Sequence, residues 1–188
     1  MQNKTESEKC LMKEYYVENQ LSQTLIQLLQ EKDLHNLTVK EVCLKAQIGR
    51  ASFYRYYSSL EDVLSQQSRR LMQEWGREFE ANPQSTPDRV FQSLFQHFQE
   101  YKEFYSILYR YQLTQVIVDT IKEKIELTAD LPNDVAYGKS FFAYAIFGWI
   151  NEWISRGMPE NPTQLNQLFQ EQAGVIWGTL QALYKQET

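Results

Sequence analysis

Apolar residues recur at intervals of three and four positions along almost the whole chain, and no stretch alternates strictly between apolar and polar. This spacing gathers apolar side chains on one face of a helix and predicts an all-α fold. Glycine (7) and proline (5) are scarce, and the prolines stand at the edges of the periodic segments. We expect about nine helices, near residues 14–31, 39–46, 50–57, 60–80, 88–101, 103–111, 113–127, 134–156 and 162–185.

Short polar motifs set several of these helix ends. Thr38 is followed three residues later by Glu41, which predicts a capping box at the start of the second helix. Ser59 is a predicted N-cap of the fourth helix. Gly157 and Pro159 are expected to end the long helix that begins near Asp134.

The two short helices at 39–46 and 50–57 are separated by Gln47, Ile48 and Gly49, and together they form a helix-turn-helix pattern. Phe53 falls on the inner face of the second helix, and its arginines, tyrosines and small residues are free to face outward. Such a mixture suits a helix that approaches base edges and phosphates. A surface helix with incidental arginines is the alternative interpretation.

The run from Leu37 to Tyr57, with its Phe-Tyr-Arg-Tyr-Tyr segment at 53–57, resembles the DNA-binding unit of the TetR family of bacterial transcription regulators. The likeness covers about residues 21–64, and it implies a helix-turn-helix domain over 1–64, with the motif at 38–57, followed by a helical dimerisation and ligand-binding domain over 65–188. The stretch Phe147–Trp153 with Gly157-Met158-Pro159 resembles the subgroup that includes the dihydroxyacetone-kinase activator. The resemblance implies DNA contacts by Thr38, Lys40, Arg50, Ala51, Ser52, Tyr54, Arg55, Tyr56 and Tyr57.

Two positions depart from the family pattern. Leu60 stands where the family usually has a phosphate-binding lysine, and Gly49 stands where serine or threonine usually caps the recognition helix. A glycine cap costs only about a few tenths of a kcal/mol. These departures motivate an alternative function, a TetR-like co-regulator that acts through protein–protein contacts with weak or no direct DNA binding.

The net charge of −5 argues at first against a nucleic-acid partner, because proteins that bind nucleic acids are usually basic. The charge is unevenly distributed, however: residues 1–70 hold 10 Lys and Arg against 9 Asp and Glu, and residues 71–188 hold 9 against 15. Residues 38–57 contain four cationic side chains and one acidic side chain, that of Glu41, which gives a local charge of +3. Because salt screens charges beyond about 8 Å, this local charge decides the interaction with phosphates.

The C-terminal two-thirds predict two further surfaces. The helix near 134–156 is apolar all round, so a second subunit is the expected cover for one face, although the core of a monomer is the alternative. The expected dimer interface comprises Phe142, Ile146, Trp149, Trp153, Phe169, Ile176 and Leu180. By resemblance, a ligand pocket is expected at Trp75, Phe79, Phe98, Tyr101, Tyr105 and Tyr109, with a plain aromatic core as the alternative.

Signals for other protein classes are weak. Cys10 and Cys43 lack the spacing of a zinc site and fit a reduced chain, His97 is the lone histidine of the aromatic region, and no catalytic or phosphate-cradling motif is present. We therefore expect neither an enzyme nor a metal or other cofactor. The N-terminus lacks the apolar core of a signal peptide, which predicts a cytoplasmic protein. The predicted function is a homodimeric repressor that binds operator DNA and responds to a small-molecule effector.

Overall fold

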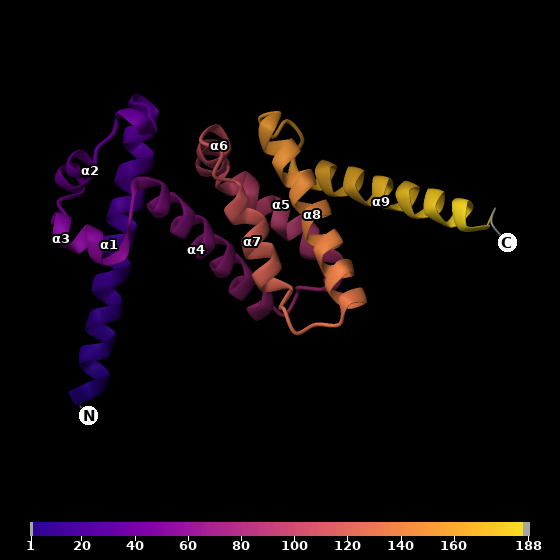
Figure 1. Cartoon of the computed structure of the whole chain (residues 1–188), viewed down its shortest axis with the longest axis horizontal. Coiled ribbons are helices and arrows are strands. Elements are labelled where there is room, and N and C mark those ends of the chain that lie inside the picture. Colours follow the sequence, from indigo (N-terminus) through magenta and orange to yellow (C-terminus); the bar gives the residue numbers. More distant parts are fainter. Residues whose placement is uncertain (1, 186–188) are drawn as a thin grey trace. The chain divides into compact units, whose positions relative to one another are not determined.

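The computed structural model describes the backbone of residues 2–185 and the side chains of residues 15–86, 88–172 and 174. Over this range the chain is all-α, as predicted, and has nine α-helices and two short 3-10 helices (Figure 1). The elements are α1 (Gln2–Glu31), η1 (Leu34–Asn36), α2 (Val39–Ala46), α3 (Arg50–Tyr56), α4 (Leu60–Ala81), η2 (Pro87–Arg89), α5 (Val90–Glu100), α6 (Lys102–Arg110), α7 (Gln115–Lys124), α8 (Asn133–Ser155) and α9 (Pro162–Lys185).

Three predicted helix starts are wrong, and one of them is that of α7, which begins at Gln115 and not near residue 113. The first helix begins at Gln2 and not near Glu14. The prediction placed the start too late because residues 2–13 lack apolar periodicity, although they are rich in helix-forming Glu, Lys and Gln. The helix expected from residue 88 begins at Val90 instead. It follows a tighter turn, in which Arg89 N donates to Thr86 O at 2.9 Å.

The helices gather into two compact units. Unit 1 comprises residues 1–72 and 107–120, and unit 2 comprises residues 73–106 and 121–188. Helices α4, α6 and α7 each contribute residues to both units. The domain boundary expected between residues 64 and 65 stays a prediction.

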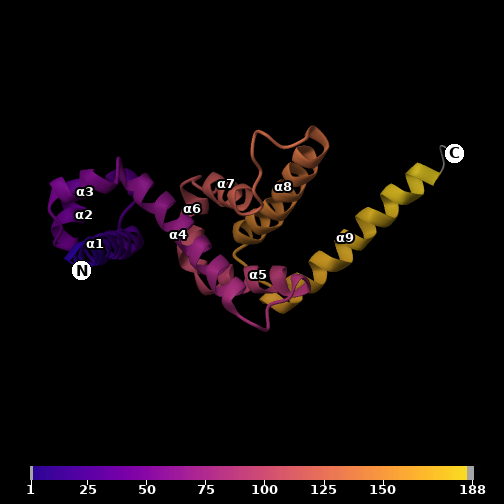
Figure 2. The same cartoon turned by 90° about the horizontal axis from the view of Figure 1, so that it is seen from below.

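Unit 1 is built on the inner face of α1. Leu21 and Leu25 are fully buried there, together with Phe53 of α3, and α2 and α3 lie beside α1 (Figure 2). The segment 107–120 belongs to the same core, because Tyr111 Oη accepts a hydrogen bond from Leu34 N at 3.1 Å. The core therefore holds the two short helices against a long one and leaves their outer faces exposed.

Unit 2 has a core rich in aromatic residues. Phe95 and Phe98 of α5 are fully buried, and so are Tyr105 of α6 and Ile150 of α8. The first part of α9 packs on α5 (Figures 1 and 2). None of the helices in the described range combines the length and the hydropathy that crossing a bilayer requires.

Candidate nucleic-acid interface

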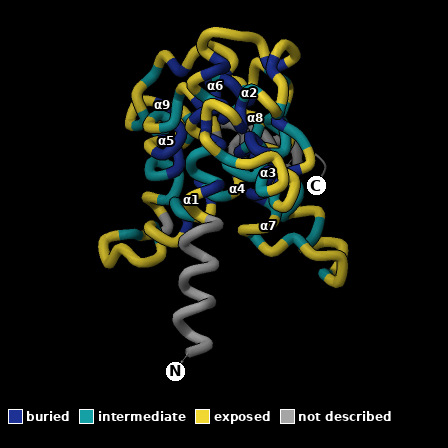
Figure 3. Tube along the Cα trace, turned by 90° about the vertical axis from the view of Figure 1, so that its left-hand side faces the viewer, coloured by how far each residue is buried: buried dark blue, intermediate teal, exposed yellow. Residues whose placement is uncertain are grey.

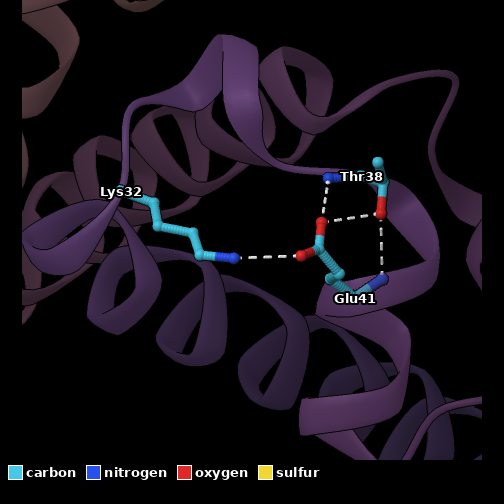
Figure 4. A network of polar contacts seen from close by, with 3 residues as sticks. All are labelled: Lys32, Thr38 and Glu41. Atoms are coloured by element: carbon cyan, nitrogen blue, oxygen red, sulfur yellow. Dashed lines mark hydrogen bonds and ion pairs between the residues drawn. The ribbon is translucent and has the colours of Figure 1, made fainter.

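The start of α2 is fixed by the predicted capping box (Figure 4). Glu41 N donates to Thr38 Oγ1 at 3.3 Å, and Glu41 Oε2 accepts from Thr38 N at 2.9 Å and from Thr38 Oγ1 at 2.8 Å. Lys32 Nζ lies 3.0 Å from Glu41 Oε1. The hydrogen bond from the Thr38 hydroxyl, followed by that from Lys32, lowers the pKa of Glu41 to about 2. The carboxylate is therefore ionised across the physiological range and holds Thr38 at the helix N-terminus.

The turn between α2 and α3 begins at Gln47, whose φ of 56° lies in the left-handed region. Ile48 N donates to Cys43 O at 2.9 Å and closes the end of α2. Gly49 then caps α3 without a side-chain hydrogen bond, while its carbonyl accepts from Ser52 N at 2.9 Å and from Phe53 N at 3.1 Å. The backbone alone thus shapes a three-residue turn, and the missing Ser or Thr cap does not prevent α3 from forming.

Helix α3 presents a polar face to solvent. Phe53 anchors its inner face, and exposed and buried positions alternate along α2 and α3 (Figure 3). Eight predicted DNA-contact residues lie at the surface: Thr38, Lys40, Arg50, Ala51, Tyr54 and Arg55 are exposed, and Ser52 and Tyr56 are half-buried. Lys45 of α2 is exposed as well, so the four cations counted in the sequence all reach solvent. We call this surface of α2 and α3 the basic face.

Tyr57 differs from the other eight residues. It is only 5% exposed, and its ring centroid lies 5.7 Å from that of Phe53. The sequence pattern did not separate it from Tyr54, which is 61% exposed. Most of the Tyr57 side chain is packed in the core, so little of it can reach a phosphate. Its predicted phosphate contact stays a prediction.

The junction between α3 and α4 is also fixed by side chains. Asp62 N donates to Ser59 Oγ at 3.1 Å, which confirms Ser59 as the predicted cap. Gln66 Nε2 donates to Tyr56 O and to Asp62 Oδ1, both at 3.1 Å. Burial raises the pKa of Asp62, but hydrogen bonds from Ser58 and Gln66 outweigh it, and the net shift is downward. Leu60 is only 6% exposed, so its side chain belongs to the core and offers no charge to a phosphate.

Four of the six aromatic residues predicted to line a ligand pocket surround His97 of α5. Trp75, Tyr101 and Tyr105 lie with ring centroids 6.3, 5.1 and 5.7 Å from the imidazole, and His97 Nε2 forms a 2.7 Å hydrogen bond with Tyr105 Oη. Phe98 packs on Tyr105 with ring centroids 4.2 Å apart. Burial lowers the pKa of His97 to about 4 and raises that of Tyr105. These five residues, which we call the His97 cluster, form a packed aromatic core.

A cavity of about 430 Å³ lies next to this cluster, within unit 2. Its lining residues are Phe79, Asn82, Gln84, Ser85, Arg89, Gln92, Ser93 and Gln96. Phe79 is the single member of the predicted pocket set among them, and Tyr109 of that set is 41% exposed. Sequence reasoning missed the other seven, because scattered amides and hydroxyls carry no motif or periodic signal.

The predicted dimer-interface residues divide into three groups. Ile146 and Trp153 are 2% and 3% exposed and therefore belong to the core of unit 2. Phe142 is 43% exposed, and Trp149 packs against Phe169 with ring centroids 5.4 Å apart. The side chains of the remaining two, Ile176 and Leu180, lie outside the described residues. The sequence missed the most exposed aromatic residues of α8, which are Tyr137 at 70% and Phe141 at 73%.

Metal chemistry receives no support from the described side chains. Among them, no three His, Cys, Asp or Glu residues are close enough together to hold an ion. Cys43 is a buried free thiol, and burial raises its pKa. It is therefore a small core residue of α2.

Comparison with known proteins agrees with this geometry. The family model described as bacterial regulatory proteins, tetR family, matches residues 23–66, and a model described as a transcriptional regulator C-terminal region matches residues 85–173. The chain belongs to the TetR family. The first match covers α2, α3 and the capping box, so the basic face is part of the segment that is typical of the family.

One similar relative is an uncharacterised HTH-type transcriptional regulator of Bacillus subtilis strain 168, YxbF, with 39% identity over 51 residues. The match covers 25% of this chain and only 13% of that regulator. Among solved structures, Lin0861 of Listeria innocua has a TM-score of 0.74 and 19% identity, over 88% of this chain and 93% of its own. A protein of Syntrophomonas wolfei assigned to the TetR family of transcriptional regulators has a TM-score of 0.57 and 12% identity, over 81% and 90%. These structures support the all-α TetR-like fold across most of the chain.

Proposed function

We propose that this TetR-family protein is a homodimeric repressor that binds operator DNA through the basic face. The observation that carries the proposal is helix α3, which is anchored by buried Phe53 and exposes Arg50, Tyr54 and Arg55. Guanidinium groups read guanine edges in the major groove and also contact phosphates. The acidic total charge does not oppose this role, because the excess of acids lies in residues 71–188.

The N-terminus of α2 offers a second contact with DNA. Thr38 is exposed at the helix start, where the helix dipole favours an anion, and a phosphate that contacts Thr38 would take the place of the Glu41 carboxylate that now accepts from its N–H and its hydroxyl. Lys40 and Lys45 add exposed positive charge on the same short helix. In this arrangement α2 binds the DNA backbone and α3 reads the bases, as in other helix-turn-helix proteins.

A second copy of the chain is the proposed cover for the exposed face of α8. Tyr137, Phe141 and Tyr144 follow one another at helical spacing and are 70%, 73% and 48% exposed. A row of exposed aromatic residues marks a protein–protein interface. We place Phe141 at the centre of this interface because it is the most exposed of the three. Ile146 and Trp153 are left out, because they are already buried within their own subunit.

A two-fold dimer fits the proposed DNA contact, because it presents two recognition helices to half-sites about 34 Å apart. Regulators of the TetR family bind operator DNA and dimerise. Binding of a small-molecule effector in unit 2 would then release the operator, and this completes the proposed function.

The experiment selects binding sites from a random duplex DNA library and measures their affinity by fluorescence anisotropy at several salt concentrations. We expect a two-fold symmetric consensus and an affinity that falls with salt, with a slope of about 0.9 per phosphate contact. Lys40→Gln should reduce the slope by about one contact. Arg77→Gln is the matched control, since Arg77 is an exposed cation of α4 outside the basic face.

The outcome that overturns the proposal is equally specific. If a folded, dimeric preparation selects no consensus at low salt, the protein does not recognise an operator by itself. That result would favour the co-regulator that acts through protein–protein contacts, which the loss of the lysine at Leu60 motivates.

A further inference from the structure

The 430 Å³ cavity of unit 2 has a polar lining, which is unusual for a small-molecule site of this size. It is built from the end of α4, the connection at 82–85, the 3-10 helix η2 and the first turns of α5. Seven of its eight lining residues carry a polar side chain, and Phe79 is the exception. Its volume falls within the range of about 300–1,000 Å³ that is typical of ligand pockets.

Arg89 is the one charged residue among the eight. Within the described part of the chain, no carboxylate lies within ion-pair distance of its guanidinium group. The neighbouring Asp88 hydrogen-bonds to Thr86, which is the main cause of its lowered pKa, and the charge of Arg89 contributes less. Asp88 is not part of the lining. Arg89 is therefore an exposed cation in the lining with no carboxylate of the described residues at ion-pair distance, and its planar guanidinium group fits a carboxylate.

The amides of the cavity suit hydroxyl groups. Asn82 Oδ1 already accepts from Gln84 N at 3.0 Å, which fixes this side chain by its oxygen and leaves its amide N–H groups available. Gln84 and Gln96 supply two further carboxamides, and Ser85 adds a hydroxyl. Gln92 Nε2 already donates to Thr163 Oγ1 at 3.4 Å, so this carboxamide offers mainly its oxygen. A carboxamide presents a donor and an acceptor side by side, which matches the donor and acceptor of an alcohol.

Phe79 gives the cavity one apolar wall and connects it to the His97 cluster. Its ring stacks on Trp75 with centroids 5.9 Å apart, and Trp75 Nε1 donates to Ser93 Oγ at 3.0 Å. Phe79 and Ser93 both line the cavity, and both are in contact with Trp75. Because Trp75 contacts two lining residues, its fluorescence emission should change when a ligand occupies the cavity.

From this lining we propose that the cavity binds a small polyhydroxylated carboxylate, such as a sugar acid, with its carboxylate on Arg89 and its hydroxyls on the carboxamides. The proposal rests on the proposed function, because it names the chemical class of the effector. The aromatic pocket expected from the sequence would favour an apolar effector, so the two predict opposite preferences.

The test is isothermal titration calorimetry of the purified full chain with three probes. D-gluconate carries both the carboxylate and the hydroxyls, D-sorbitol carries the hydroxyls alone, and hexanoate carries the carboxylate on an apolar chain. We expect D-gluconate to bind at least about tenfold more tightly than either of the others, a difference of ~1.4 kcal/mol. Equal or tighter binding of D-sorbitol or hexanoate, or no binding of any probe at millimolar concentration, would overturn the proposal.

Variants assign the binding to this cavity. Arg89→Gln should weaken D-gluconate binding by about tenfold, while Arg77→Gln, which removes an exposed arginine outside the lining, should leave it unchanged. Addition of D-gluconate should change the tryptophan emission of the wild type but not that of Trp75→Phe. Equal effects of the two arginine variants would show that binding takes place elsewhere and would contradict the proposal.

These measurements use no DNA, so they are separate from the proposed function. Loss of operator recognition with intact D-gluconate binding would refute the DNA-binding role alone. Intact operator recognition without D-gluconate binding would refute the ligand class alone.

Discussion

The buried imidazole of His97 makes the stability of the protein depend on pH in a predictable direction. Burial lowers the pKa of His97 from an ordinary value of about 6.5 to about 4 in the folded state. Between these values the unfolded chain binds a proton that the folded chain does not, so stability falls as the pH decreases. The stabilisation is complete above about pH 6.5 and is lost as the pH falls toward about 4.

With these two pKa values, linkage gives a loss of about 2 kcal/mol in the free energy of unfolding between pH 7 and pH 5. The same interval excludes most carboxyl effects. Glu41, Asp62, Asp88 and Asp130 have lowered pKa values, and their stabilisation is lost only as the pH falls below about 4.5. The histidine contribution can therefore be measured by itself.

His97→Phe removes the imidazole, and urea unfolding followed by circular dichroism at pH 7, 6 and 5 measures the stability of both proteins. We expect the variant to be less stable at pH 7, by about 1–3 kcal/mol, because the buried Tyr105 hydroxyl loses its 2.7 Å partner. Its stability should nevertheless decrease by about 2 kcal/mol less than that of the wild type between pH 7 and pH 5.

His35→Gln is the matched control, because His35 is the other histidine of the chain and is exposed. This control should retain the pH dependence of the wild type. If stability depends on pH in the same way for the wild type and His97→Phe, the imidazole titrates equally in the folded and unfolded states, and burial does not shift its pKa.

Three other expectations concern the capping box, the basic face and the dimer. Thr38→Ala removes the partner of Glu41 and should lower the thermodynamic stability by about 1 kcal/mol in urea unfolding; no change would show that the cap is not needed. Arg55→Ala should reduce the discrimination between bases at one position of the selected operator by ~1–3 kcal/mol of binding free energy, whereas an equal loss of affinity for all sequences would show that Arg55 contacts a phosphate. Phe141→Glu should give monomers in sedimentation velocity without unfolding, since Phe141 is 73% exposed; a stable dimer would refute the proposed interface.

The local structure of the helix-turn-helix could be predicted from the amino-acid sequence. Thr38 and Glu41 are three residues apart, and that spacing closes a capping box in almost any tertiary context because all its atoms belong to one helical turn. The same holds for Ser59 as the cap of α4. Phe53 is the one large side chain of α3 without a polar group, so its burial followed from the pattern alone.

The exposed and buried surfaces of the C-terminal part could not be predicted in this way, because they depend on tertiary packing. Helix α8 is apolar on every side, so periodicity cannot say which aromatic residues fill the core and which remain exposed. Packing decided that Trp153 is buried and that Phe141 is exposed. Which polar residues share a cavity depends on segments that meet in space, as Asn82, Arg89 and Gln96 do. A capping box is decided within one turn of helix, whereas a core, an exposed face and a cavity are decided by the packing of separate helices and turns against one another.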